Sequence, residues 1–159
     1  MNTDLPTTPG LADRLDPAHL TPAERDVVAQ IAKDGTQVIH FWAPWCGNAI
    51  NELTSGFAEV VKRQPGAAFT FVTIWNEGAS GAETLTHFGL AERVHEVLAD
   101  GFGPREPREL RRRVFLGLPL TWIPTTWIFH KNGELAFAFN YGELAPATLE
   151  EALAATSPE

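Results

Sequence analysis

The side chains best suited to chemistry are gathered in residues 41–49, which read FWAPWCGNA. Cys46 is the only cysteine of the chain, so neither an internal disulfide nor a thiolate cage for zinc can form. It lies between a strand-like run and a helix-like run. A thiol at a helix N-terminus faces backbone N–H groups and the helix dipole, which favour the thiolate. The position predicts a reactive nucleophile, and the alternative is a buried, inert cysteine.

A lone thiolate can attack a disulfide, but it has no second thiol in the chain to release the mixed disulfide that forms. Release would have to come from an external thiol such as glutathione, or from a thiol on the partner. Three redox roles are open: a glutathione-linked monothiol enzyme, a disulfide isomerase or thiol carrier, and a sensor that is oxidised reversibly. A fourth role, from a different class, is a binding module without chemistry.

The remaining candidate residues are histidines and arginines. Four histidines (His19, His87, His95 and His130) are scattered and match no metal-ligand spacing, so we expect no metal site. We expect no cofactor. His40, in the strand before Cys46, is either a residue that tunes the thiol or a core histidine. The arginines at 105, 108 and 111–113 form a basic cluster. This cluster is either a solvated helix face or a docking patch for an acidic partner or an anionic ligand.

Composition sets the class of protein. With 44% hydrophobic and 20% charged residues, the 159-residue chain is expected to form a globular domain. The net charge of −8 argues against nucleic-acid binding. No apolar run reaches the roughly 20 residues of a membrane span. No basic segment followed by an apolar run opens the sequence, so we expect a cytoplasmic protein, although a processed exported chain would look the same.

The hydrophobic pattern predicts an α/β protein. Residues 1–20 are predicted to be a poorly ordered N-terminal extension and 21–159 the domain. The expected helices are 21–35, which opens with a Thr21–Glu24 capping box, the run after Cys46, 79–88, 109–118 and 144–156. The expected strands are 36–44, 67–75 and the two arms of a hairpin around Lys131-Asn132-Gly133, while 92–100 fits a helix or a strand. Strands joined by helices, followed by a hairpin, predict a mixed sheet covered by helices.

In this order of elements the sequence resembles the thioredoxin-like superfamily, and within it thioredoxin and the reductases of the TlpA and ResA type. The resemblance rests on FWAPWCGNA, on IPTTWIFHKNGE at 123–134 and on YGELAPATLEEAL at 141–153. It covers about residues 22–155. It implies a thioredoxin-like fold with a mixed central sheet flanked by helices, and an insertion before the strand that follows Pro124.

The resemblance also implies a site. Cys46 falls on the exposed nucleophilic cysteine, and Pro124 falls on the proline that follows a cis peptide bond and packs against it. The substrate groove would be formed by Trp45, Gly47, Asn48, Ile123 and Pro124.

Two positions depart from the family pattern. Ala49, natural or engineered, stands where the family has its resolving cysteine, and His40 stands where thioredoxins have a buried acid that serves that cysteine. The resemblance therefore implies a divergent single-cysteine protein that exchanges thiols and disulfides with protein or small-molecule partners, glutathione among them. The alternative is a non-catalytic interaction module with a thioredoxin fold.

Overall fold

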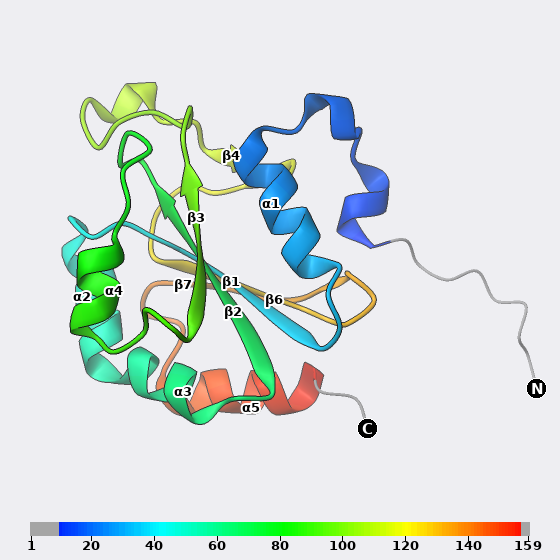
Figure 1. Ribbon diagram of the computed structural model, residues 1–159, viewed down its shortest axis with the longest axis vertical. Coiled ribbons are helices and arrows are strands. Elements are labelled where there is room, and N and C mark those ends of the chain that lie inside the picture. The colour runs from blue at the N-terminus through cyan, green and yellow to red at the C-terminus, as the bar shows by residue number, and fades with distance from the viewer. Residues whose placement is uncertain (1–9, 157–159) are drawn as a thin grey trace, which may run out of the picture.

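The computed structural model describes residues 10–156, except for the side chains of residues 12 and 13 (Figure 1). The α-helices are α1 (Pro22–Ile31), α2 (Gly47–Glu52), α3 (Ala58–Arg63), α4 (Ala82–His87) and α5 (Pro146–Thr156). The strands are β1 (Thr36–Trp42), β2 (Ala67–Ile74), β3 (Val94–Ala99), β4 (Val114–Phe115), β5 (Leu118–Pro119), β6 (Thr125–Phe129) and β7 (Leu135–Asn140). Short 3-10 helices occur at Leu11–Arg14, Pro17–His19 and Arg108–Leu110, and Leu53–Phe57 form a π-helical turn.

A five-stranded sheet in the order β3-β2-β1-β6-β7 forms the centre of the molecule. β2 runs parallel to β1 and to β3, whereas β6 runs antiparallel to β1 and to β7. The predicted mixed sheet flanked by helices is thus confirmed. Figure 1 shows α1 on one side of the sheet and α3 and α5 on the other.

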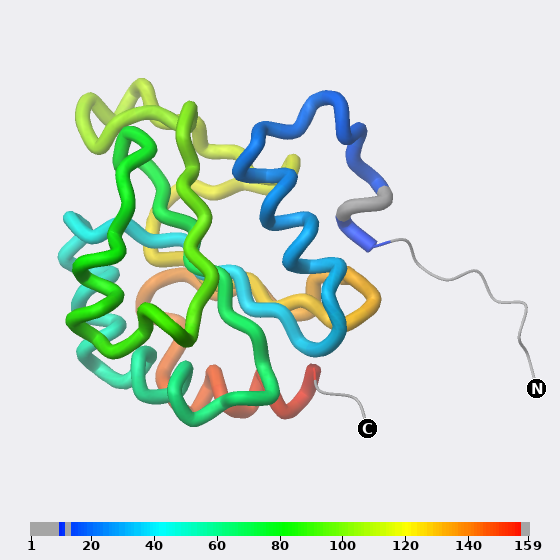
Figure 2. The backbone as a smooth tube through the Cα atoms, in the orientation of Figure 1, coloured from blue at the N-terminus to red at the C-terminus, as the bar shows by residue number. Residues whose placement is uncertain are grey.

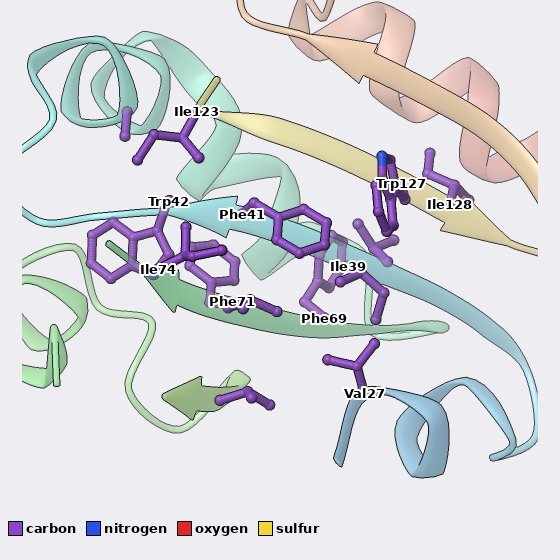
Figure 3. Packing of buried hydrophobic residues seen from close by; sticks show 14 of the residues in the cluster. Val27, Ile39, Phe41, Trp42, Phe69, Phe71, Ile74, Ile123, Trp127 and Ile128 are labelled. Atoms are coloured by element: carbon purple, nitrogen blue, oxygen red, sulfur yellow. The ribbon is translucent and has the colours of Figure 1, made fainter. Parts of the chain in front are cut away.

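The two faces of β1 pack against different neighbours, because successive side chains of a strand point to opposite sides. Phe41 contacts the ring of Trp127, with centroids 4.5 Å apart (Figure 3). It also contacts the ring of Phe115, with centroids 5.0 Å apart. His40 points the other way and stacks on Phe57, at 4.3 Å between ring centroids. The whole strand is buried. The end of β1 is therefore held firmly where the chain turns toward Cys46.

The expected helix at the start of the domain is present. Thr21 caps α1, and the predicted capping box with Glu24 is confirmed by both of its hydrogen bonds. The ambiguous segment 92–100 contains strand β3, which is fixed by its parallel pairing with β2.

The helix predicted over residues 109–118 is wrong. Only Arg108–Leu110 form a 3-10 turn, and β4 and β5 follow as a hairpin. Its two-residue turn, Leu116-Gly117, has φ angles of 52° and 75°, which suit a turn with two left-handed residues. Phe115 is fully buried, and the Trp75 indole donates a hydrogen bond to the Arg112 carbonyl at 3.2 Å. Tertiary contacts therefore override the local helix preference. Figure 2 shows this stretch, in yellow-green to yellow, reaching the N-terminal end of α1.

The helical run after Cys46 is kinked rather than continuous. Gly56 has a φ of 134°, a conformation that favours glycine. A Cβ at this position would lie 2.5 Å from Cγ of Pro146, the first residue of α5. The kink separates α2, which borders Cys46, from α3.

The segment before α1 contacts the domain. Leu11 is buried, and its N–H donates to the Gly133 carbonyl at 3.1 Å. Residues 1–9 lie outside the described residues, so the division at residue 20 stays a prediction. Within residues 10–156, no helix is long and apolar enough to cross a membrane.

Candidate functional site

Cys46 lies at the junction between β1 and α2, as the N-cap residue of α2. Its N–H donates to the Ala43 carbonyl at 3.1 Å, and its own carbonyl accepts from Ile50 at 3.0 Å. The thiol Sγ lies 3.7 Å from the carbonyl oxygen of Ile123. The junction therefore presents the sulfur to a loop 77 residues further along the chain.

That loop precedes β6, and its Ile123–Pro124 peptide bond is cis. Ile123 and Pro124 are both buried, whereas Gly47 and Asn48 are exposed on the first turn of α2. The structure thus brings the two predicted segments together at the sulfur. Trp122 is 55% exposed at the loop.

The thiol is less open than the resemblance implies. Cys46 keeps 9% of its surface exposed, since Ile123 covers it on one side. The neighbouring Trp45 is half-buried, and its indole donates to the Trp75 carbonyl at 3.1 Å. Only a small part of Cys46 is therefore open to a reagent or substrate.

His40 is a core histidine. It is fully buried, and its Nδ1 lies 2.8 Å from the Thr126 hydroxyl oxygen. Burial lowers the pKa of His40 to about 3, because an imidazolium ion loses its hydration there. At neutral pH the ring is uncharged.

Glu52, the last residue of α2, is not among the residues that the sequence pattern singled out. It is 7% exposed, and burial raises the pKa of its carboxyl to about 7. Its Oε1 lies 3.7 Å from Nε2 of His40, and neither atom has a hydrogen-bond partner among the groups that the structure describes. A buried acid thus lies beside His40, on a different element from the one that carries it in thioredoxins. Its position three residues after Ala49, on the same helix face, is the signal that could have found it.

The position of the absent resolving cysteine is also buried. Ala49 has no exposed surface and lies one helical turn after Cys46 and one turn before Glu52. The helix face that carries the thiol therefore continues through a small residue to a buried carboxyl.

The basic cluster is brought to the site by the insertion between β3 and β6. The Cζ atoms of Arg105 and Arg111 lie 5.0 and 5.2 Å from the ring centroid of Trp45. Arg111 also lies 4.9 Å from the Trp75 ring. These arginines do not occupy a helix face, and two of them cover the tryptophan next to Cys46.

Replacing Glu52 by glutamine is expected to change how stability depends on pH. The carboxyl stabilises the fold fully below its unfolded pKa of 4.5, and this contribution is lost as pH rises through about 7. His40 acts in the opposite direction, since its contribution is complete above pH 6.5 and is lost as pH falls toward 3. In the natural sequence the two effects offset each other between pH 4.5 and 6.5.

Urea unfolding of both proteins between pH 4.5 and 8 tests this expectation. The difference in unfolding free energy should shift by on the order of 3 kcal/mol in favour of Glu52→Gln as pH rises. Groups common to both proteins cancel in that difference. Parallel curves would show that Glu52 titrates as an ordinary exposed carboxyl.

The side chains that the structure describes, in residues 10–11 and 14–156, include no group of three or more histidines, cysteines, aspartates or glutamates placed to hold a metal ion.

No protein-family model and no curated protein matches the chain. Solved structures do. A thio-disulfide isomerase from Thermus thermophilus superposes with a TM-score of 0.54 at 21% identity, over 83% of this chain and 84% of that chain. A DsbF homologue from Corynebacterium diphtheriae gives 0.55 at 18%, over 78% and 73%. A secreted Mycobacterium tuberculosis disulfide oxidoreductase homologous to E. coli DsbE gives 0.55 at 16%, over 76% and 81%. The chain therefore has the thioredoxin-like fold.

Proposed function

We propose that this chain is a single-cysteine thiol-disulfide exchange protein with Cys46 as its nucleophile. The observation that carries the proposal is the meeting of Cys46 Sγ with the Ile123 carbonyl, 3.7 Å apart, at the loop that holds Pro124. With the sulfur at a strand-to-helix junction and a buried loop against it, an extended substrate could bind along this loop with its disulfide beside Cys46. Similar structures that are named for disulfide chemistry support the same reading.

The exchange has two steps. The Cys46 thiolate attacks one sulfur of a substrate disulfide, the S–S bond breaks, and the other sulfur leaves as a thiolate. Cys46 is then joined to the substrate in a mixed disulfide. An external thiolate attacks that bond and frees the Cys46 thiolate, because Ala49 leaves the chain without a resolving sulfur.

The proposed groove would place the substrate. Ile123 and Pro124 would form its floor, and Trp45 with the exposed Gly47 and Asn48 would form its rim. We expect protein or small-molecule thiols and disulfides as partners, glutathione included, and no nucleic acid. A cytoplasmic location stays a prediction, and the similar structures include secreted proteins.

The test is the rate at which Cys46 forms a mixed disulfide with 2-hydroxyethyl disulfide, followed by mass spectrometry of the intact protein. We expect the folded protein to react faster than the same chain unfolded in urea, although only 9% of the residue is exposed. The adduct should persist until an external thiol is added, and Cys46→Ser should form none.

A folded protein that reacts more slowly than the unfolded chain would contradict this function. The cysteine would then be an inert core residue, and the non-catalytic interaction module would become the better explanation of the fold.

A further inference from the structure

The segment 105–113 is the strongest positively charged feature of an acidic chain. It holds five arginines and two glutamates, while the whole chain has a net charge of −8. Arg112 pairs with buried Glu24 at 3.4 Å, and Arg108 lies 3.9 Å from Glu106. Among the described side chains, those of residues 10–11 and 14–156, no carboxylate lies within ion-pair distance of the three remaining arginines, Arg105, Arg111 and Arg113.

Arg111 is held in a fixed position. Its Nε donates to the Arg105 carbonyl at 3.1 Å, and its Nη2 donates to the same oxygen. Its guanidinium group lies over the rings of both Trp45 and Trp75. A guanidinium group that is stacked and hydrogen-bonded has little side-chain entropy left to lose when it binds an anion.

The same group lies over Trp45, the residue directly before Cys46, at 5.2 Å from the ring centroid. Partial burial lowers the pKa of Arg111, and of the nearby charges Glu106 raises it whereas Arg108 and Arg113 lower it. Arg108, Glu109, Arg111 and Arg113 also line an open hollow on the surface. A negative group in this hollow would face more positive than negative charge.

We propose that Arg111, with Arg105 and Arg113 beside it, selects disulfide substrates that carry a carboxylate close to the disulfide. This inference rests on the proposed exchange at Cys46 and gives it a substrate class. A carboxylate held over Trp45 would bring the neighbouring S–S bond to the adjacent sulfur. The bonds that form and break are those of the exchange itself.

The experiment compares three small disulfides of similar size: 3,3′-dithiodipropionate (anionic), cystamine (cationic) and 2-hydroxyethyl disulfide (neutral). Rates of adduct formation at Cys46 are divided by the rates of a small neutral thiol with the same probes, which removes intrinsic differences in reactivity. We expect the corrected rate with the anionic probe to be at least about five times the rate with the cationic probe at low salt. This ratio of rates should fall toward one as salt screens the charges.

Arg111→Gln should lower that ratio about fivefold, and Arg111→Lys should keep most of it. Arg63→Gln is the matched control, because Arg63 is an exposed arginine on α3 that pairs with Glu150, and it should leave the ratio unchanged. Disulfide-linked peptides with Asp or Lys beside the cysteine repeat the comparison for a polypeptide source of the carboxylate.

Equal corrected rates for the three probes would overturn this inference and leave the exchange function standing. A ratio that is insensitive to Arg111→Gln in a folded variant would also overturn it. The absence of any adduct with all three probes would overturn both the function and the inference.

Discussion

An Ala49→Cys variant is expected to release a Cys46 mixed disulfide without any external thiol. The introduced thiol would lie one helical turn after Cys46, within reach of a disulfide. It would attack the Cys46 sulfur, expel the bound thiolate and close an internal disulfide. Because the reaction becomes intramolecular, release should be at least about 100-fold faster than in the natural sequence at millimolar external thiol. The added sulfur enters a fully buried site, at a cost of about 1–3 kcal/mol in stability.

Glu52 decides how well that variant works. Its carboxyl, with a pKa raised to about 7, can exchange a proton with a thiol near neutral pH, whereas His40, with its pKa lowered to about 3, cannot. Adding Glu52→Gln to Ala49→Cys should therefore slow release about tenfold or more. On this expectation Glu52 would supply the buried acid that the sequence lacks at position 40, and His40 would need no substitution.

These rates are measured by following, over time, the release of a preformed 2-hydroxyethyl adduct from Cys46. Glu59→Gln in the Ala49→Cys background is the control, since Glu59 is exposed on α3 and pairs with Lys62. If release is unchanged by Glu52→Gln, the carboxyl has no part in proton transfer. If Ala49→Cys retains its adduct indefinitely, position 49 does not face the sulfur.

Glu24→Ala is expected to lower the free energy of unfolding by about 3 kcal/mol or more. The carboxylate is 1% exposed and accepts hydrogen bonds from the N–H groups of Thr21 at 2.9 Å and Leu116 at 2.6 Å. It also pairs with Arg112. Its loss leaves the buried N–H of Leu116 and the partly buried N–H of Thr21 without this acceptor. It also removes the contacts of Glu24 with Arg112 and Leu116, which tie the insertion to α1.

Urea unfolding at neutral pH measures this loss. Glu24→Gln keeps one carbonyl oxygen and should cost about half as much. Glu83→Ala removes an exposed carboxylate from α4 and should cost less than about 0.5 kcal/mol. A loss below about 1 kcal/mol for Glu24→Ala would show that water replaces the carboxylate at this junction.

Local sequence patterns predicted the elements around Cys46 well, because these elements depend on residues that are close together in the sequence. The buried run of β1, the capping box of α1 and the turn at Asn132-Gly133 each depend on neighbours a few residues away. Gly133, with a φ of 83°, has the conformation for which glycine is favoured there.

Segments whose structure depends on distant partners were not predictable in this way. β3 is defined by pairing with β2, and the β4–β5 hairpin by Phe115 in the core and Glu24 on the Leu116 amide, 92 residues away. Glu52 escaped notice because a carboxylate on a helix usually faces water. Its burial follows from the packing of α2 against His40, and the spacing from Ala49 is the one local signal that points to it.

The kink at Gly56 has a mechanical consequence. α2 is a short helix, with Cys46 at its N-terminal end and the bend toward α3 at its other end. Pro146 packs closely against Gly56, since a Cβ atom added to Gly56 would lie 2.5 Å from the proline ring. The start of α5 therefore limits the space at the bend. We expect a shift at the start of α5 to displace Gly56, and with it the end of α2 that lies opposite Cys46.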